Sequence, residues 1–404
     1  QLWLRGLKYT ERPESEIPPE DLLRIDICWS VAAGLVLVDN IRGMDFQTRH
    51  LLLALKVGEP YRLARAIAIE AGLSATPGEP NRKRTTRFLK EAHSLSEKVN
   101  SPHVTGLVIM NEAAAAYLVG EWRKAYELCE RAAEIFRDQC TGVNWEITTA
   151  HRFLLNALMF LGELKEVSLR LPVLLAAAKE QGNLFASTDL RTRLNLIWLA
   201  ADDPDRARLE VVEALQEWPH KGFHLQHYSS LSAMAQIMLY TGDGHVAWKH
   251  FSQQWSQMKR SVLLRIQVLR VEANYLLARC ALAAAQQGTE PQRLLRTAER
   301  IALQITRERL KWADPYVSLI RAGIHSIRGE SESAASFLKD AAEGFRSVDM
   351  NLYANVARRH LGQLIGGDEG KQLTKEADEW MTAQLIKKPE LMARTLAVVK
   401  HDKR

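Results

Sequence analysis

Cysteine, proline and long apolar runs are scarce in this sequence, and each shortage excludes a class of protein. The four cysteines lie far apart and none belongs to a CxxC pair. This spacing argues against a disulfide framework or a zinc site, and we expect buried free thiols in a reducing cytoplasm. No run of about 18 uncharged apolar residues occurs, so we expect no membrane span.

Strand signals are also missing. We find no series of short alternating Val, Ile and Thr runs joined by Asn-Gly or Asp-Gly turns. The 13 prolines fall mostly between apolar-periodic runs, and apolar residues make up 47% of the 404 positions, enough for a continuous core. Together these patterns predict an all-α protein.

The charge is mildly basic, with a formal net charge of +6. Most cations are interspersed with Asp and Glu, which is typical of a solvated helical surface. The run Asn81 to Arg87 (NRKRTTR) and the face formed by Arg293, Arg296 and Arg300 could meet phosphates. No aromatic residues are interleaved for base stacking, so nucleic acid is not an expected partner. A solvated face, or a dock for an acidic protein surface, explains these runs equally well.

The clearest local pattern is AAAAYLVGEWRKAYELCERAAEIF, from Ala113 to Phe136. From Trp122 onward, apolar and small residues recur every three or four positions, as on one face of a helix. Gly120 stands where one helix must end and the next begin, because glycine adopts positive φ at little cost. We interpret this stretch as a helical hairpin of tetratricopeptide (TPR) type, with Trp122 in its core.

The hairpin recurs along the chain with a period of about 42 residues, longer than the usual 34. Between the last two turns one degenerate hairpin fits, turning at Gln286 to Pro291 around Gly288. This regularity predicts a right-handed superhelix of TPR-like helical hairpins with helical caps at both ends. The turn residue and the small or apolar residues after it are Gly120/Trp122/Ala125, Gly162/Leu164/Val167, Asp202/Pro204/Ala207, Gly242/Gly244/Ala247 and Gly329/Ser331/Ala334.

The repeats divide the chain into four predicted parts. These are an extended lead-in (1–20), an N-terminal helical cap region (21–100), the TPR-like repeats (101–362) and C-terminal capping helices (363–404). In the cap region, we expect Gly43 to end a turn and Phe46 to Leu55 to form a helix. In the tail, we expect a loop at Gly366 to Gly370, a final helix from Pro389, and fraying after Lys400.

Two blocks flank the repeats. One is RIDICWSVAAGLVLVDNIRGMDFQTRHLLLALKVGEPYRLARAIAIEAG, from Arg24 to Gly72, and the other is RRHLGQLIGGDEGKQLTKEADEWMTAQLIKKPELMARTLA, from Arg358 to Ala397. Both resemble the C-terminal region of large bacterial serine/threonine protein kinases, in which a kinase domain and a signalling-type ATPase module precede a TPR-like tail. The resemblance implies a regulatory or ligand-sensing tail, with the kinase and ATPase modules of the parent chain as partners.

The catalytic motifs of such a parent are missing from the sequence. HRD, DFG and a glycine-rich kinase loop do not occur, and neither does GxSxG. The nearest match to a P-loop is GGDEGK, from Gly366 to Lys371, which is one residue short and is followed by Gln372. Cys140 has no context that would lower its pKa. We therefore expect a non-catalytic chain without a cofactor, cut from a longer protein because it lacks an initial Met.

In a TPR hairpin the first helix lines the concave groove, so polar residues on these helices are candidates for ligand contact. Asn both donates and accepts hydrogen bonds, and Arg offers a two-pronged donor for carboxylates. Plain solvent exposure is the alternative for each residue. The candidates are Asn111, Tyr117, Arg152, Asn156, Asp189, Arg193, Gln236, Tyr240 and Tyr316.

Three histidines, His220, His224 and His227, have a spacing that metal ligands can have. No cysteine or carboxylate completes the set within their loop, so ordinary loop or helix-entry histidines are the simpler interpretation.

Two classes of function follow. The first is a non-catalytic scaffold that binds a protein or peptide in its concave groove. The alternative is a sensor domain for a small molecule or nucleic acid in a signalling ATPase. The steep salt dependence of nucleic-acid binding separates these two classes.

Overall fold

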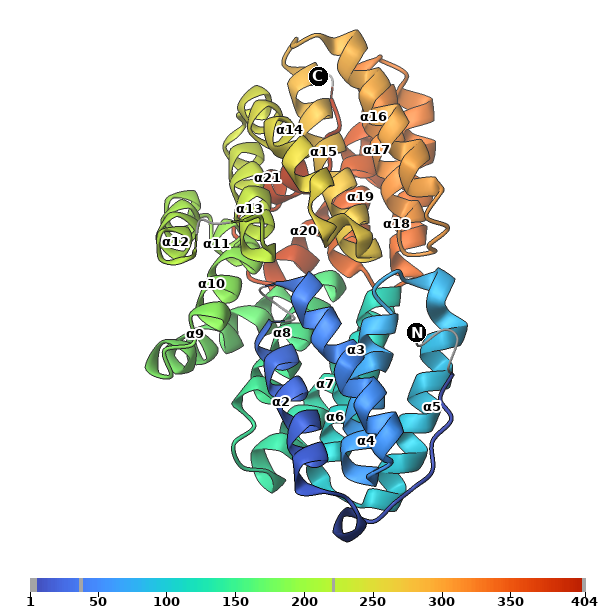
Figure 1. The fold of residues 1–404 in the computed structure, drawn as a ribbon. Helices are drawn as coiled ribbons and strands as arrows, with labels where there is room; N and C mark the ends of the chain where they lie inside the picture. Colours follow the sequence, from blue (N-terminus) through green and yellow to red (C-terminus); the bar gives the residue numbers. More distant parts are fainter. Residues whose placement is uncertain (1–5, 36–38, 220–221, 402–404) are drawn as a thin grey trace. The chain divides into compact units, whose positions relative to one another are not determined.

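The computed structural model describes residues 6–35, 39–219 and 222–401. These residues form α-helices and short 3₁₀ turns, and no strand occurs among them (Figure 1). The all-α prediction is confirmed. The contacts fall into two compact units, which we describe separately: unit 1 is Gln1–Ala157 with Arg265–Gln267, and unit 2 is Leu158–Leu264 with Val268–Arg404.

Unit 1 consists of antiparallel helices, of which α6 and α7 form the hairpin that the sequence showed most clearly. Gly120 ends α6 with a φ of 89°, and Trp122 at the start of α7 is 1% exposed. The helices are α2 (Pro19–Leu35), α3 (Asn40–Val57), α4 (Pro60–Ser74), α5 (Arg82–Val99), α6 (Pro102–Val119), α7 (Trp122–Gln139) and most of α8 (Asn144–Leu161).

Unit 2 continues the series of hairpins. Its helices are α9 (Leu164–Glu180), α10 (Leu184–Arg193), α11 (Leu196–Ala200), α12 (Pro204–Glu217), α13 (Leu225–Thr241), α14 (Gly244–Arg260), α15 (Gln267–Gln286), α16 (Pro291–Thr306), α17 (Asp314–Ile327), α18 (Ser331–Arg346), α19 (Asn351–Ile365), α20 (Gly367–Ala383) and α21 (Pro389–Leu396). The 3₁₀ turns η1 (Glu14–Glu16), η2 (Glu79–Asn81) and η3 (Val262–Arg265) complete the described secondary structure.

The predicted hairpin turns lie where the sequence placed them. Every predicted turn residue has a positive φ, the backbone conformation that ends a helix and reverses the chain. The degenerate hairpin is also present, since α15 ends at Gln286 and α16 begins at Pro291. The φ values are 89° at Gly120, 85° at Gly162, 57° at Asp202, 89° at Gly242, 88° at Gly288 and 80° at Gly329.

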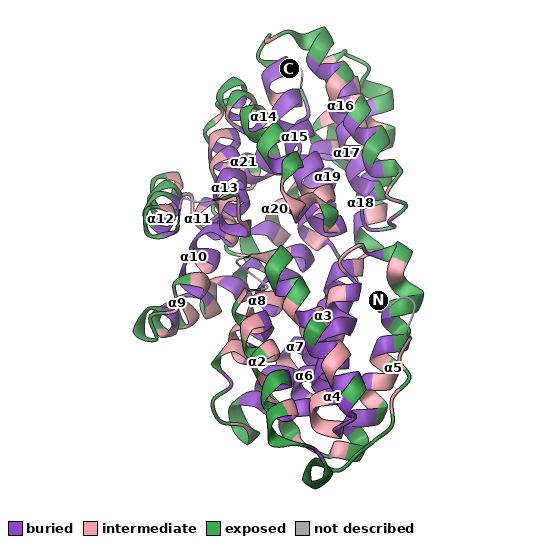
Figure 2. Ribbon diagram, viewed as in Figure 1, coloured by how far each residue is buried: buried purple, intermediate pink, exposed green. Residues whose placement is uncertain are grey.

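The two helices of a hairpin differ in burial. Helix α6 is buried over most of its length, whereas α7 buries one stripe that includes Ala125, Cys129 and Phe136. Figure 2 shows the same contrast between α17 and α18 in unit 2. The first helix is covered on several sides, so its polar residues must find partners inside the protein.

Two local predictions were wrong. Gly43 does not end a turn: it lies inside α3, which begins at Asn40 because the Asp39 side chain accepts a hydrogen bond from the backbone N–H of Arg42 and caps the helix. The predicted loop at Gly366 to Gly370 is mostly helical, since α20 begins at Gly367.

The tail is helical up to Leu396. Helix α21 begins at Pro389, as predicted. Helix α20 packs on α19, and α21 contacts α13, α19 and α20. The four-part division, with residues 363–404 as a cap, stays a prediction. Among the described residues, no helix combines the length and apolarity that a membrane span requires.

Candidate functional site

The nine predicted groove residues lie in both units, and most are buried. Arg152, Arg193 and Gln236 are half-buried. The buried ones are Asn111, Tyr117, Asn156, Asp189, Tyr240 and Tyr316. Solvent exposure therefore does not explain this set, and its assignment to a ligand groove stays a prediction.

The buried asparagines bond to their own helices. Asn111 Nδ2 donates to the carbonyl of Leu107 at 2.8 Å, and Asn156 Nδ2 donates to that of Arg152 at 2.7 Å. Asn274 and Asn355 make the same bond, at 2.9 Å each. Asn274 and Asn355 were not predicted, although an asparagine in the first helix of a hairpin was the available signal.

Three predicted tyrosines have structural partners. The ring of Tyr117 makes an edge contact with Trp122, with 5.4 Å between ring centroids. Tyr316 lies 4.1 Å from Tyr275 in an aromatic cluster, and burial raises the pKa of both well above the ordinary value. Tyr240 donates to Asp202 at 2.7 Å. Burial, then the hydrogen bond to this carboxylate, raises the pKa of Tyr240.

A group of polar side chains, most of them buried, lies between α10 and α13. We call it the α10–α13 polar cluster, and it comprises Thr192, Asn195, Ser229, Ser232 and Gln236, which line a cavity of about 20 Å³. That volume is close to the space one water molecule needs.

Several polar atoms at this cluster have no partner within the described chain. The unpaired atoms are Asn195 Oδ1, Ser229 Oγ, Ser232 Oγ and, nearby, Thr188 Oγ1, Ser230 Oγ and both side-chain polar atoms of Gln226. A buried polar group without a hydrogen bond costs about 1–3 kcal/mol. A water molecule held in the cavity, or a polar group of a bound ligand, would supply the partners that these atoms need.

A break in the helix shapes the cluster. Helix α10 ends at Arg193, and α11 begins at Leu196. Asn195, which lies in the break, donates its Nδ2 to the carbonyl of Ala207 on α12 at 2.8 Å. This bond holds the break in place, while the Oδ1 of the same residue stays unpaired in the chain. Residues 195, 229 and 232 were not predicted, because a serine within a helix carries no signal of burial.

Two charged pairs involve α15, and one of them contains Arg193, which lines the cavity. Arg193 on α10 donates to both carboxylate oxygens of Glu272 on α15, at 2.8 Å each. Arg270 pairs with Glu308 in the same two-pronged way, at 2.6 Å. Both pairs are largely sheltered, so they keep more of their attraction than exposed pairs do. To bind a ligand carboxylate, Arg193 would have to exchange Glu272 for it.

The histidine cluster acts as a helix cap. His224 Nδ1 accepts from Trp218 Nε1 at 3.2 Å, and His227 Nδ1 accepts from the backbone N–H of His224 at 3.0 Å. His220 lies outside the described residues. Across the described residues, no group of three or more His, Cys, Asp or Glu side chains could hold a metal ion.

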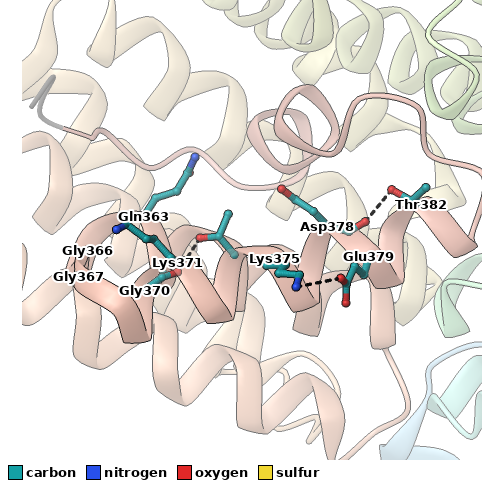
Figure 3. Close-up of a pocket in the computed structure, with 11 residues that line it drawn as sticks. Gln363, Gly366, Gly367, Gly370, Lys371, Lys375, Asp378, Glu379 and Thr382 are labelled. Carbon is teal, nitrogen blue, oxygen red and sulfur yellow. Dashed lines mark hydrogen bonds and ion pairs between the residues drawn. The ribbon is translucent and has the colours of Figure 1, made fainter.

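The glycine-rich stretch lines an open depression of about 910 Å³ along α20 (Figure 3). An added Cβ at Gly362 would lie 2.5 Å from the carbonyl oxygen of Gly370, and one at Gly370 would lie 2.3 Å from that of Gly362. These glycines allow α19 and α20 to approach closely, which explains them without a phosphate. The nearby Lys371 and Lys375 pair with Asp368 and Glu379 on their own helix.

The basic run Asn81 to Arg87 is partly neutralised. Arg82 pairs with Glu79 and Glu121, and Arg84 pairs with Glu70.

The four cysteine thiols are sheltered from solvent to different degrees. Cys129 and Cys280 are buried, Cys28 and Cys140 are half-buried, and burial raises the pKa of all four thiols, that of Cys280 to about 12.

Comparison with known proteins gives the fold. No protein-family model matches the sequence, and no curated protein matches it. Among solved structures, the apo form of the quorum sensor NprR from B. thuringiensis matches with a TM-score of 0.55 at 12% identity, covering 91% of this chain and 99% of that one. The chain has a TPR-like fold. The TPR domain of P58(IPK) also aligns, at 9% identity over 90% of this chain and 99% of that one, but its TM-score is only 0.19.

Proposed function

We propose that this chain is a non-catalytic regulatory scaffold that binds a protein or peptide segment. The observation that carries the proposal is the α10–α13 polar cluster, where buried donors and acceptors on the first helices of successive hairpins have no partner in the described chain. Such groups are costly unless something pairs with them.

The chemistry of the cluster suits a peptide backbone. Serine hydroxyls and carboxamides both donate and accept, as the N–H and C=O groups of a peptide require. Gln236 is half-buried at this cavity, and the Arg193–Glu272 pair lies beside it. Three of the predicted groove residues form the core of the proposed site. They are Asp189 and Arg193, which share α10, and Gln236.

We further propose that the chain is the C-terminal part of a cytoplasmic bacterial serine/threonine kinase. The two flanking blocks, Arg24 to Gly72 and Arg358 to Ala397, support this origin through their resemblance to such tails. The ligand would then control the kinase and ATPase modules of the parent. A sensing role is also in keeping with the structural neighbour, which is a quorum sensor.

The test is a selection of binders from a random peptide library against the full chain. We expect Ser229→Ala, Ser232→Ala and Gln236→Ala each to weaken a selected peptide by about tenfold, because each removes one polar partner. Fluorescence anisotropy measures the affinity. If no peptide is recovered, or if these variants bind the peptides unchanged, the proposal fails.

Stability gives a second readout for the same serines. Ser229 Oγ has no partner in the described chain, so Ser229→Ala should leave the free energy of unfolding within about 0.5 kcal/mol or raise it. Ser74 is the matched control, because its hydroxyl bonds to the carbonyl of Ala71 and to Thr85, both at 2.8 Å. Ser74→Ala should cost about 1 kcal/mol in chemical denaturation. Equal costs would show that Ser229 is paired in solution.

A further inference from the structure

The second half of α21 and the residues that follow it are buried. From Met392 to Val399, every residue except Arg394 is at most 6% exposed. Helix α21 ends at Leu396, and Ala397 is extended, with a φ of −144° and a ψ of 135°. We call residues 389–400 the tail segment.

Side chains on α15 and α17 hold the backbone of the tail segment. On α15, the Tyr275 hydroxyl donates to the carbonyl of Leu396 at 2.6 Å, and Arg279 Nη1 donates to that of Thr395 at 2.7 Å. On α17, the Ser326 hydroxyl accepts from the backbone N–H of Lys400 at 3.0 Å. All three contacts are made to main-chain groups: the two carbonyls belong to the last turn of α21, and the N–H belongs to a residue after the helix.

The helices leave room for this backbone. An added Cβ at Gly323 on α17 would lie 2.5 Å from the carbonyl oxygen of Val398. A glycine inside a helix costs about 1 kcal/mol relative to alanine. The close approach of the tail segment explains why a glycine stands at this position.

Arg394 within the tail segment and His401 just beyond it reach two further helices. Arg394 donates to the carbonyl of Tyr240 at the end of α13, at 2.9 Å. Beyond Lys400, the ring of His401 stacks on that of His360 on α19, with 5.2 Å between centroids. The segment therefore lies along α13, α15, α17 and α19 in the way expected of a bound peptide, and we call these four helices the receiving face.

We propose that the tail segment is an exchangeable intramolecular ligand of the receiving face, and that the external partner is a peptide of the same chemistry, with a helical turn followed by an extended stretch. Such a peptide is apolar, with small residues such as Ala and Val, and carries one arginine. The inference rests on the proposed function for its external partner, and it adds regulation, since this partner must displace the tail segment.

The experiment uses the full chain with a protease recognition sequence inserted between Lys387 and Lys388, both exposed. The chain is cleaved after folding and mixed with a fluorescent synthetic peptide of residues 388–401. We expect the cleaved fragment to stay bound during gel filtration and then to exchange with the labelled peptide. A scrambled peptide should not compete. A fragment that never exchanges, or a core that unfolds when the fragment leaves, overturns the proposal.

A pair of tyrosine variants of the nicked chain tests the geometry. Tyr275→Phe removes the hydroxyl that binds Leu396, so the labelled peptide should bind about tenfold more weakly. Tyr353→Phe is the control, because this tyrosine lies in the same aromatic cluster but its ring contacts are with Tyr275, Tyr316 and Phe345. Its binding should stay within about twofold. Equal losses in both variants would contradict the assigned contact.

The two proposals can fail separately. If selected peptides bind at the α10–α13 polar cluster but the nicked chain never exchanges its fragment for the 388–401 peptide, the proposed function stands and the tail segment is only structural. If the 388–401 peptide exchanges but no library peptide binds the uncut chain, the exchange of the tail segment stands, and the proposed function falls together with the external partner.

Discussion

Trp122 shows how one residue supports a hairpin. It is 1% exposed and makes an edge contact with Tyr117 across the α6–α7 turn. We predict that Trp122→Ala lowers the free energy of unfolding by about 3–5 kcal/mol, because a large cavity opens in unit 1. Thermal or urea denaturation measures the loss. Trp255→Ala, at a half-buried position, should cost clearly less, and a Trp122 variant with an unchanged melting temperature would contradict the packing.

His50 gives unit 1 a dependence on pH. It is fully buried, and burial, reinforced by the positive charge of Arg65, lowers its pKa from 6.5 to about 3. Below pH 6.5 the unfolded chain takes up a proton that the folded chain refuses. The stability contribution is therefore fully present above pH 6.5 and is lost as the pH falls towards 3.

We predict that His50→Asn flattens this part of the pH profile. The Asn amide can replace the His50 Nδ1 that lies 3.0 Å from Gln47 Oε1, but it does not titrate. Urea denaturation at about pH 7 and about pH 5 measures the difference in stability. If wild type and variant lose equal stability between these pH values, His50 is not the group responsible.

At the scale of elements, the crossing of α19 and α20 depends on glycine. An added Cβ at Gly370 would lie 2.3 Å from the carbonyl oxygen of Gly362, a separation that real side chains do not tolerate. We predict that Gly370→Ala destabilises the chain by about 1–3 kcal/mol, although alanine favours helix formation.

Gly34 in α2 is the matched control. An added Cβ at Gly34 meets nothing within 4 Å, so Gly34→Ala should be neutral or stabilising by up to about 1 kcal/mol. The sign of the two effects, measured by thermal denaturation, separates close packing from helix propensity. Stabilisation by both substitutions would show that the two helices lie further apart.

At the scale of the whole molecule, the net charge is +6, and some of the cations in the two basic patches are neutralised by carboxylates. Arg82, Arg84 and Arg293 are paired with carboxylates. We predict that a single-stranded DNA 20-mer binds weakly and loses most of its affinity between about 50 and about 200 mM salt. Peptide binding at a buried polar site should change little over the same range. Filter binding at both salt concentrations measures this, and salt-resistant DNA binding would favour the nucleic-acid sensor.

The sequence by itself determined the hairpin architecture. Gly120, Gly162, Asp202, Gly242 and Gly329 were identified as turns because ending a helix is a local event. It depends on a residue that accepts positive φ and on the apolar spacing around it. The burial of Trp122 followed from the same spacing. The local pattern predicted the wrong structure at two places. At Gly43 a capping aspartate extends the helix, and at Gly366 to Gly370 the glycines belong to the crossing of two helices.

Only the tertiary structure decided which polar groups are paired. Asn111 and Asn195 look alike in sequence, yet Asn111 packs on Gly72 while Asn195 leaves an unpaired oxygen beside a cavity. The tail segment is a stronger case, because the residues that hold its backbone, Tyr275 and Arg279, lie more than a hundred positions away. Partners at such sequence separations are set by packing, which no local pattern encodes.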